Sequence, residues 1–238
     1  MAWGILYGVG VGPGDSGLLT AKGKAVLRCA NVICVPKSKN ERESVALTVA
    51  KPHFNANAVV EELLFPMSRD EAVLAKHWVM AAKRVAELLA IHGSVAFLTI
   101  GDPLLYSTFG YLLKNLKFIA PEVRVEVVPG VSSFNAAAAL LRIPLVEKDE
   151  RLAVVPLPVS VEEFKALSRY IDTFVFLKVS AAYDQLLDIL AGTEFEAEAY
   201  LVSRCGGGDE FWTNDPFVLR GEPVDYLSLL IAKRRRTL

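Results

Sequence analysis

Gly8-Val9-Gly10-Val11-Gly12-Pro13-Gly14-Asp15 is a Gly-rich turn that ends an apolar, strand-like run beginning at Ile5. A strand that enters such a turn and then a helix builds a ligand crevice in an open α/β sheet. Two further turns follow apolar runs in the same way, Gly101-Asp102-Pro103 and Val128-Pro129-Gly130-Val131-Ser132-Ser133. Glycine permits positive φ and lets a ligand approach the main chain closely. Three such turns in the first 133 residues predict one composite site.

Composition narrows the class of protein. With 238 residues, 53% of them hydrophobic, the chain has material for one large or two medium globular domains. A formal net charge of −1 argues against nucleic acid or an acidic membrane as a partner. The three cysteines have no metal-ligand spacing, and no metal site is expected. We expect a soluble, cytoplasmic protein without a signal sequence or membrane span.

The first half alternates between strand-like and helix-like segments. Strands are predicted over residues 5–11, 31–36, 59–65, 94–100 and 124–128, all buried on both faces. One helix is expected from a Thr20 cap to about Ala30, and a longer one over residues 69–91. This alternation predicts a five-stranded parallel sheet with right-handed crossovers. We place the domain boundary near residue 145, giving α/β domains over 1–145 and 146–238.

The second half predicts a smaller, mixed sheet. Strands are expected over residues 152–157, 173–179, 199–202 and 211–213. Helices are expected after Ser160, where Glu163 completes a capping box, and after Ser180. A final helix is predicted from Asp225 into the basic run that ends at Arg236, whose charges suit a helix C-terminus.

Two common phosphate-binding motifs fail on the first turn. The dinucleotide pattern G-x-G-x-x-G needs glycine where Pro13 or Asp15 stands, and no glycine precedes Lys24 at Walker spacing. An aspartate here repels a pyrophosphate, and Asp15 is interpreted as a local cap. Asp102 lies between Gly101 and Pro103 at a strand's carboxyl end, where ligands bind, and its carboxylate suits a cationic or hydroxyl-bearing ligand.

Taken together, the three turns resemble the signatures of the tetrapyrrole methylase family, which uses S-adenosylmethionine and releases S-adenosylhomocysteine. Leu18-Leu19-Thr20 extends the first signature and Tyr106-Ser107 the second. Within this family, residues 35–38, 99–108 and 132–141 look most like the precorrin-2 C(20)-methyltransferases of cobalamin synthesis. The resemblance spans essentially the whole chain. It implies two α/β domains with the cofactor in a cleft between them, a homodimer, and a reduced tetrapyrrole polycarboxylate as substrate.

The resemblance also implies site residues. Cofactor contacts would fall on Pro13, Gly101, Asp102, Tyr106, Ser107, Thr108, Ser132, Ser133, Leu177, Lys178, Ser203 and Arg204. In the second half the chain departs from the pattern, because Leu177 stands where methionine is common and Gly206-Gly207-Gly208 has no counterpart. The carboxylates of the substrate call for cations in loops at strand ends, and the candidates are Lys37, Lys39, Arg42 and Arg151, with Arg204.

The implied reaction needs little acid–base chemistry. A sulfonium methyl is already activated, so its transfer to the C-20 meso carbon needs in-line positioning and exclusion of water. A proton must then leave that carbon, and Asp102, Tyr106 or water can accept it. Three alternatives remain: another methylase of the family, such as a uroporphyrinogen III or later corrin methyltransferase; a non-catalytic binding module of the same fold; and an unrelated dehydrogenase-like protein.

Overall fold

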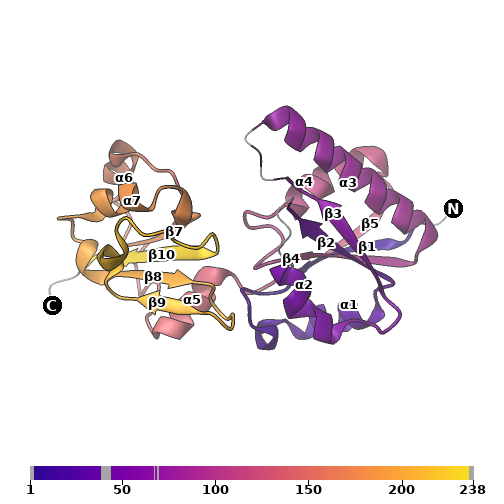
Figure 1. Ribbon diagram of the computed structural model, residues 1–238, viewed down its shortest axis with the longest axis horizontal. Coiled ribbons are helices and arrows are strands. Elements are labelled where there is room, and N and C mark those ends of the chain that lie inside the picture. Colours follow the sequence, from indigo (N-terminus) through magenta and orange to yellow (C-terminus); the bar gives the residue numbers. More distant parts are fainter. Residues whose placement is uncertain (1–2, 39–43, 67, 69, 236–238) are drawn as a thin grey trace. The chain divides into compact units, whose positions relative to one another are not determined.

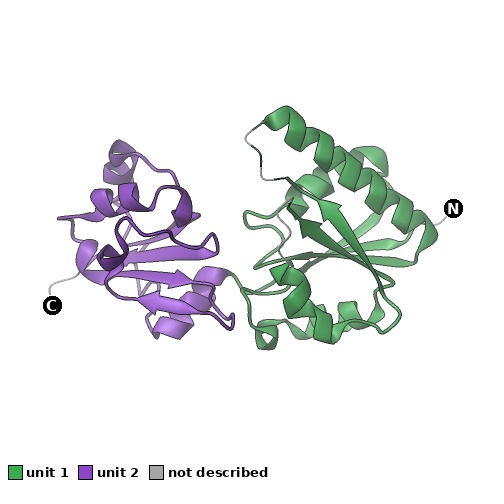
Figure 2. Cartoon of the chain, viewed as in Figure 1, with its two compact units in different colours: residues 1–132 green, residues 133–238 purple. Residues whose placement is uncertain are grey.

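The computed structural model describes residues 3–38, 44–66, 68 and 70–235. The chain forms two compact units, Met1–Ser132 and Ser133–Leu238 (Figure 2). The sequence placed this boundary later, near residue 145. Helix α5 (Ser133–Leu141) accounts for the difference, because it contacts strand β10 (Ser228–Lys233) of the second unit.

The first unit is built on a five-stranded sheet (Figure 1). Its strands are β1 (Ile5–Gly10), β2 (Val32–Lys37), β3 (Val59–Leu64), β4 (Ser94–Thr99) and β5 (Arg124–Val128). They lie in the order β3-β2-β4-β1-β5, and every pair is parallel. The helices are α1 (Ala21–Cys29), α2 (Val45–Ala50), α3 (Glu71–Ile91) and α4 (Phe109–Ile119). The predicted parallel sheet is confirmed.

Helices cover both faces of this sheet. Figure 1 shows α3 and α4 on one face and α1 and α2 on the other. A separate apolar cluster fills each side, one containing Phe97 and Phe109, the other containing Leu27 and Ile33. The expectation that all five strands are buried on both faces is wrong for β3, where Val59 is 50% exposed. β3 is an edge strand, so part of it remains in contact with water.

The second unit contains a mixed sheet, as predicted. Its strands are β6 (Leu152–Pro156), β7 (Thr173–Leu177), β8 (Ala199–Ser203), β9 (Phe211–Thr213) and β10. They lie in the order β6-β7-β10-β8-β9, with only the β6–β7 pair parallel. Besides α5, the helices are α6 (Val161–Leu167) and α7 (Tyr183–Leu190). Phe164, Phe174 and Phe195 form the aromatic centre of the core.

The predicted C-terminal helix is wrong. Residues 228–233 form the central strand β10, which pairs antiparallel with both β7 and β8. Leu230 and Ile231 are fully buried because neighbouring elements cover both faces of this strand. Such a short apolar run carries no period that separates a strand from a helix. Arg236, at the end of the basic run, lies outside the described residues.

Two of the predicted helix caps are observed. Thr20 Oγ1 accepts a hydrogen bond from the Gly23 amide at 3.1 Å, and Ser160 Oγ accepts one from the Glu163 amide at 3.1 Å. The third, Ser180, is wrong, because Ser180 lies in a 3₁₀ turn (Val179–Ala181) and α7 begins after Ala182 without a side-chain cap. None of the described helices is long and apolar enough to cross a membrane.

Candidate functional site

The three signature turns lie at one edge of the first sheet. They follow β1, β4 and β5, which are neighbours, and parallel strands bring their carboxyl ends to the same edge. The chain leaves β1 toward α1 on one face of the sheet, whereas it leaves β4 toward α4 on the other face (Figure 1). Connections that diverge in this way open a crevice beyond the carboxyl ends of the strands. The three turns therefore meet at a topological switch point.

The turns interlock through glycine backbone. A Cβ atom added at Gly130 would lie 2.0 Å from the Gly101 carbonyl oxygen, and one added at Gly10 would lie 2.5 Å from the same oxygen. Gly101 and Gly12 also form an antiparallel bridge, in which the Gly101 amide donates to the Gly12 carbonyl at 2.8 Å. No side chain larger than hydrogen fits at Gly10 or Gly130 without moving main chain. The result is one platform assembled from three distant segments.

Asp102 joins the second turn to the third. Its Oδ2 accepts a hydrogen bond from the Gly130 amide at 3.1 Å, and its Oδ1 accepts one from the Leu104 amide at 2.9 Å. Asp15 acts only within its own turn, where Oδ1 accepts from the Gly17 amide at 2.7 Å, as the sequence indicated. The two aspartates of the signatures therefore have different structural roles.

The rest of the second turn is fixed by hydroxyl groups. The Ser107 and Thr99 hydroxyls lie 2.9 Å apart, and Ser107 Oγ also accepts from the Phe109 amide at 3.1 Å. Thr108, beside it, has no side-chain cap bond to the helix it precedes. The sequence analysis did not single out Thr99. The sign that could have revealed it is a buried polar residue at the end of β4, two positions before Gly101. Ser107 is thus tied to both β4 and α4.

In the second unit, four predicted cofactor residues lie at one sheet edge. Leu177 ends β7 and Lys178 follows it, Ser203 ends β8 and Arg204 follows it, and both strands flank β10. Ser228, at the start of β10, donates through Oγ to Ser203 Oγ at 2.9 Å. The residues at the end of β7 and those at the end of β8 are 26 positions apart in sequence. They lie at one edge because β7 and β8 run in the same direction.

Three predicted site residues have left-handed backbone. Tyr106, Lys178 and Arg204 have φ of 49°, 58° and 50°, and the other described non-glycine residues with positive φ are Arg142 and Lys148. Such conformations are costly for residues with a Cβ and concentrate at functional sites. The sequence gives no sign of them, because glycine is the residue expected at positive φ.

The predicted cations are divided among different places. Lys37 ends β2 at the same edge as the turns, where its Nζ pairs with Glu62 at 2.7 Å. Arg151 precedes β6, at the edge opposite to Leu177. Arg204 pairs with two carboxylates, Asp209 at 2.6 Å and Asp225 at 3.2 Å. Its guanidinium holds the pKa of the Asp209 carboxyl below the usual range. Lys39 and Arg42 lie outside the described residues.

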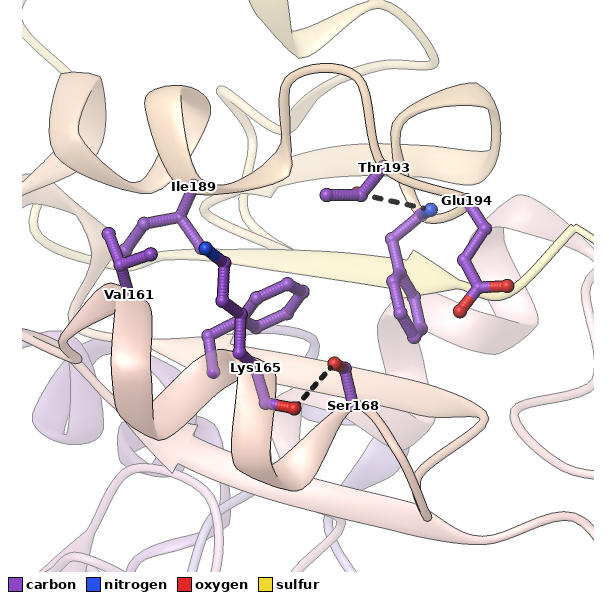
Figure 3. Close-up of a pocket in the computed structure, with 8 residues that line it drawn as sticks. Val161, Lys165, Ser168, Ile189, Thr193 and Glu194 are labelled. Atoms are coloured by element: carbon purple, nitrogen blue, oxygen red, sulfur yellow. Dashed lines mark hydrogen bonds between the residues drawn. The ribbon is translucent and has the colours of Figure 1, made fainter.

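A pocket of about 260 Å³ occurs elsewhere, in the second unit (Figure 3). Its wall comes from α6, α7 and the segment that follows α7, with Phe164 and Phe195 among the lining residues. Figure 3 shows Lys165 and Glu194 on opposite sides of it. None of the predicted site residues lines this pocket, and the turn geometry is the better guide to the ligand. Among the described residues, no group of histidine, cysteine and carboxylate side chains is arranged to hold a metal ion.

The electrostatics of the turns select the kind of ligand. Residues 8–15, 101–108 and 128–133 contain no lysine or arginine, and their only charged side chains are Asp15 and Asp102. A pyrophosphate needs positive potential or a helix N-terminus without nearby carboxylates. A ligand with a positive charge and several polar groups suits such turns better.

Comparison with known proteins places these features in a family. A profile described as Tetrapyrrole (Corrin/Porphyrin) Methylases matches residues 5–215. The chain is 39% identical to the probable cobalt-precorrin-2 C(20)-methyltransferase of Methanocaldococcus jannaschii, with 96% of each chain covered. It is 28% identical to the cobalt-precorrin-2 C(20)-methyltransferase of Salmonella typhimurium, with 98% of this chain and 97% of the relative covered.

Solved structures show the same fold. A cobalt precorrin-4 methyltransferase superimposes with a TM-score of 0.72 at 21% identity, covering 96% of this chain and 94% of the other. The uroporphyrin-III C-methyl transferase from Thermus thermophilus, complexed with S-adenyl homocysteine, gives a TM-score of 0.66 at 24% identity, with 97% of both chains covered.

Proposed function

Because the chain belongs to the family of tetrapyrrole (corrin/porphyrin) methylases, we propose that it methylates the C-20 meso carbon of precorrin-2 or cobalt-precorrin-2 in cobalamin biosynthesis. Family membership confirms the predicted enzyme class, an S-adenosylmethionine-dependent methyltransferase. The choice of substrate rests on the two C(20)-methyltransferases that the chain resembles over nearly its whole length.

The single observation that carries the cofactor site is the interlocked platform of Gly10, Gly101 and Gly130 at the switch point. The residues present fit S-adenosylmethionine. The turns lack basic side chains and carry two carboxylates, and this negative charge complements the positive charge of the sulfonium group. Pro13, the turn from Gly101 to Thr108, and Ser132-Ser133 would hold it from this side. When bound, the cofactor supplies an activated methyl group.

The second set of cofactor contacts is proposed at the edge formed by Leu177-Lys178 and Ser203-Arg204. Its support is the left-handed backbone of Lys178 and Arg204, together with that of Tyr106 in the second turn. Such conformations turn main-chain donors and acceptors out of the regular sheet pattern, where a ligand can use them.

The protein's own contribution to methyl transfer is orientation. Holding the acceptor carbon in line with the reacting bond is worth several kcal/mol, about 7 to 11 in well-oriented intramolecular reactions. A proton leaves the meso carbon afterwards, and Tyr106 or water is the proposed acceptor.

Binding of the polycarboxylate substrate is proposed to use Lys37, together with Lys39 and Arg42, which follow it in the sequence. Arg151 does not belong to this proposed set of substrate-binding residues, because it lies at the edge of its sheet opposite to Leu177. Arg204 is already neutralised by two carboxylates and is better suited to shaping its turn. We further propose a homodimer acting in the cytoplasm; the free thiols of the three cysteines fit a reducing compartment.

The test is turnover of labelled S-adenosylmethionine with metal-free precorrin-2 and cobalt-precorrin-2 side by side, with the added methyl located by NMR. Methyl at C-20 of either confirms the proposal, and the faster substrate assigns the branch of the pathway. Binding of the cofactor without transfer to either acceptor contradicts the substrate but leaves the family intact. Light scattering on the same preparation tests the dimer.

A further inference from the structure

Asp102 is placed to act on the site through the main chain. Its two carboxylate oxygens accept hydrogen bonds from two different turns, Leu104 in the second and Gly130 in the third. The Asp102 bond is the only hydrogen bond found for the Gly130 amide among the described residues. Gly130 in turn lies against the Gly101 carbonyl, so a change in its position is passed directly to the second turn.

We propose that Asp102 is a positioning residue, which fixes the third turn against the second and so sets the affinity for the cofactor, and that it does not accept the proton from the substrate. This inference rests on the proposed function for the identity of the cofactor. Both carboxylate oxygens are already engaged with backbone amides, which hold the side chain in place. A group that removes a proton must instead be directed at the reacting carbon.

Three variants test this role of Asp102. Asp102→Ala removes both acceptors, whereas Asp102→Asn keeps one carbonyl oxygen that can accept from Gly130 or Leu104. Asp70→Ala is the matched control: Asp70 begins α3, where its Oδ1 accepts from the amides of Ala72 and Val73 at 2.9 and 3.2 Å. This control also loses bonds between a carboxylate and the backbone, but at a helix start that has no place in the site.

Affinity for S-adenosylhomocysteine, measured by calorimetry, is the first readout. Bonds from amides to a charged group contribute enough that Asp102→Ala should bind the product at least about tenfold more weakly. Asp102→Asn should recover most of that loss, and Asp70→Ala should match the wild type. At saturating cofactor, Asp102→Asn should keep the wild-type pH profile of kcat. Wild-type affinity in Asp102→Asn, with kcat lost and one limb of the pH profile gone, would show that Asp102 is the proton acceptor.

The second readout needs no ligand. In protein labelled with ¹⁵N-glycine, hydrogen exchange at the Gly130 amide should be at least about tenfold faster in Asp102→Ala than in the wild type or Asp70→Ala. Unchanged exchange would overturn the proposal whatever the enzyme's activity. If the wild-type protein bound no S-adenosylhomocysteine, the proposed function would fail, while the exchange measurement would still decide whether Asp102 holds the third turn.

Discussion

Substituting Gly130 tests whether the three turns form one rigid platform. In Gly130→Ala, the new Cβ would lie 2.0 Å from the Gly101 carbonyl oxygen and 2.8 Å from Gly10 Cα. A relaxed contact between carbon and oxygen needs more than about 3 Å, so main chain must move by about 1 Å. No flexible side chain lies there to give way, because every one of these atoms belongs to the backbone.

The size of the effect follows from that displacement. Overpacking of this kind costs about 1–3 kcal/mol, and weakening of the bridge between Gly12 and Gly101 adds about 1 kcal/mol. A domain with the usual 5–15 kcal/mol of stability stays folded after a loss of about 2–4 kcal/mol. The site is more sensitive than the fold: displaced backbone no longer matches the cofactor, so affinity should fall, and a misplacement of about 1 Å costs on the order of 100-fold in catalytic rate.

The assay combines urea unfolding with calorimetric titration of S-adenosylhomocysteine. Gly110→Ala is the matched control: Gly110 lies within α4, and an added Cβ meets nothing within 4 Å. Alanine there should raise stability by about 0.5–1 kcal/mol, because glycine is a poor helix residue, and should leave affinity unchanged. If Gly130→Ala unfolded and bound ligand like the wild type, the interlocked platform would be refuted.

Three further predictions concern stability. Gly8→Ala should lower the free energy of unfolding in urea by about 1–3 kcal/mol, because its Cβ would lie 2.3 Å from Phe109 Cζ. Combining it with Phe109→Leu in a double-mutant cycle should recover part of that loss, and strictly additive losses would contradict the contact. Gly101 has φ of +69° with open space around its Cβ position, so Gly101→Val should lower stability by about 1–2 kcal/mol and Gly101→Asn by less. Burial raises the pKa of the Cys34 thiol to about 12 and that of Cys205 to about 11. Above about pH 8.5 the thiols of the unfolded chain lose their protons, whereas the two buried thiols of the folded protein keep theirs. The free energy of unfolding should therefore fall by about 1.4 kcal/mol per pH unit for each thiol. The double variant Cys34→Ala, Cys205→Ala should lose this pH dependence.

Local chemistry explains what the sequence could predict. Strand and helix alternation, and the caps Thr20 and Ser160, depend on neighbours within a few residues, and these were confirmed. The Ser180 cap was not, because the chain forms a 3₁₀ turn there before α7 begins. The strand at residues 228–233 was missed because its structure is decided by pairing with β7 and β8, which lie far away in sequence. An apolar stretch of this length satisfies a helix and a central strand equally well.

In the candidate site, too, the features set by neighbouring residues were predictable and those set by long-range pairing were not. The three turns were found from their glycines, and their convergence was expected because parallel strands end at a common edge. The contact that unites them, with the Gly101 carbonyl between Gly10 and Gly130, depends on a sheet order that a single sequence does not reveal. The role of Asp102 was likewise ambiguous, because a carboxylate beside glycine and proline suits a cap, a ligand contact or a base equally.

The nature of the platform agrees with the chemistry proposed for it. Its contacts are almost entirely between main-chain atoms, and the one long-range hydrogen bond to a side chain among the described residues of the turns runs from the Gly130 amide to the Asp102 carboxylate. Backbone held in this way offers fixed donors and acceptors but few groups that can exchange protons near neutral pH. Such a surface is poorly suited to reactions that need a strong acid or base. It is well suited to transfer of a methyl group that is already activated, because there the barrier is lowered chiefly by holding two reactants in line. Variants that move the backbone should therefore damage this site more than variants that only remove a charge.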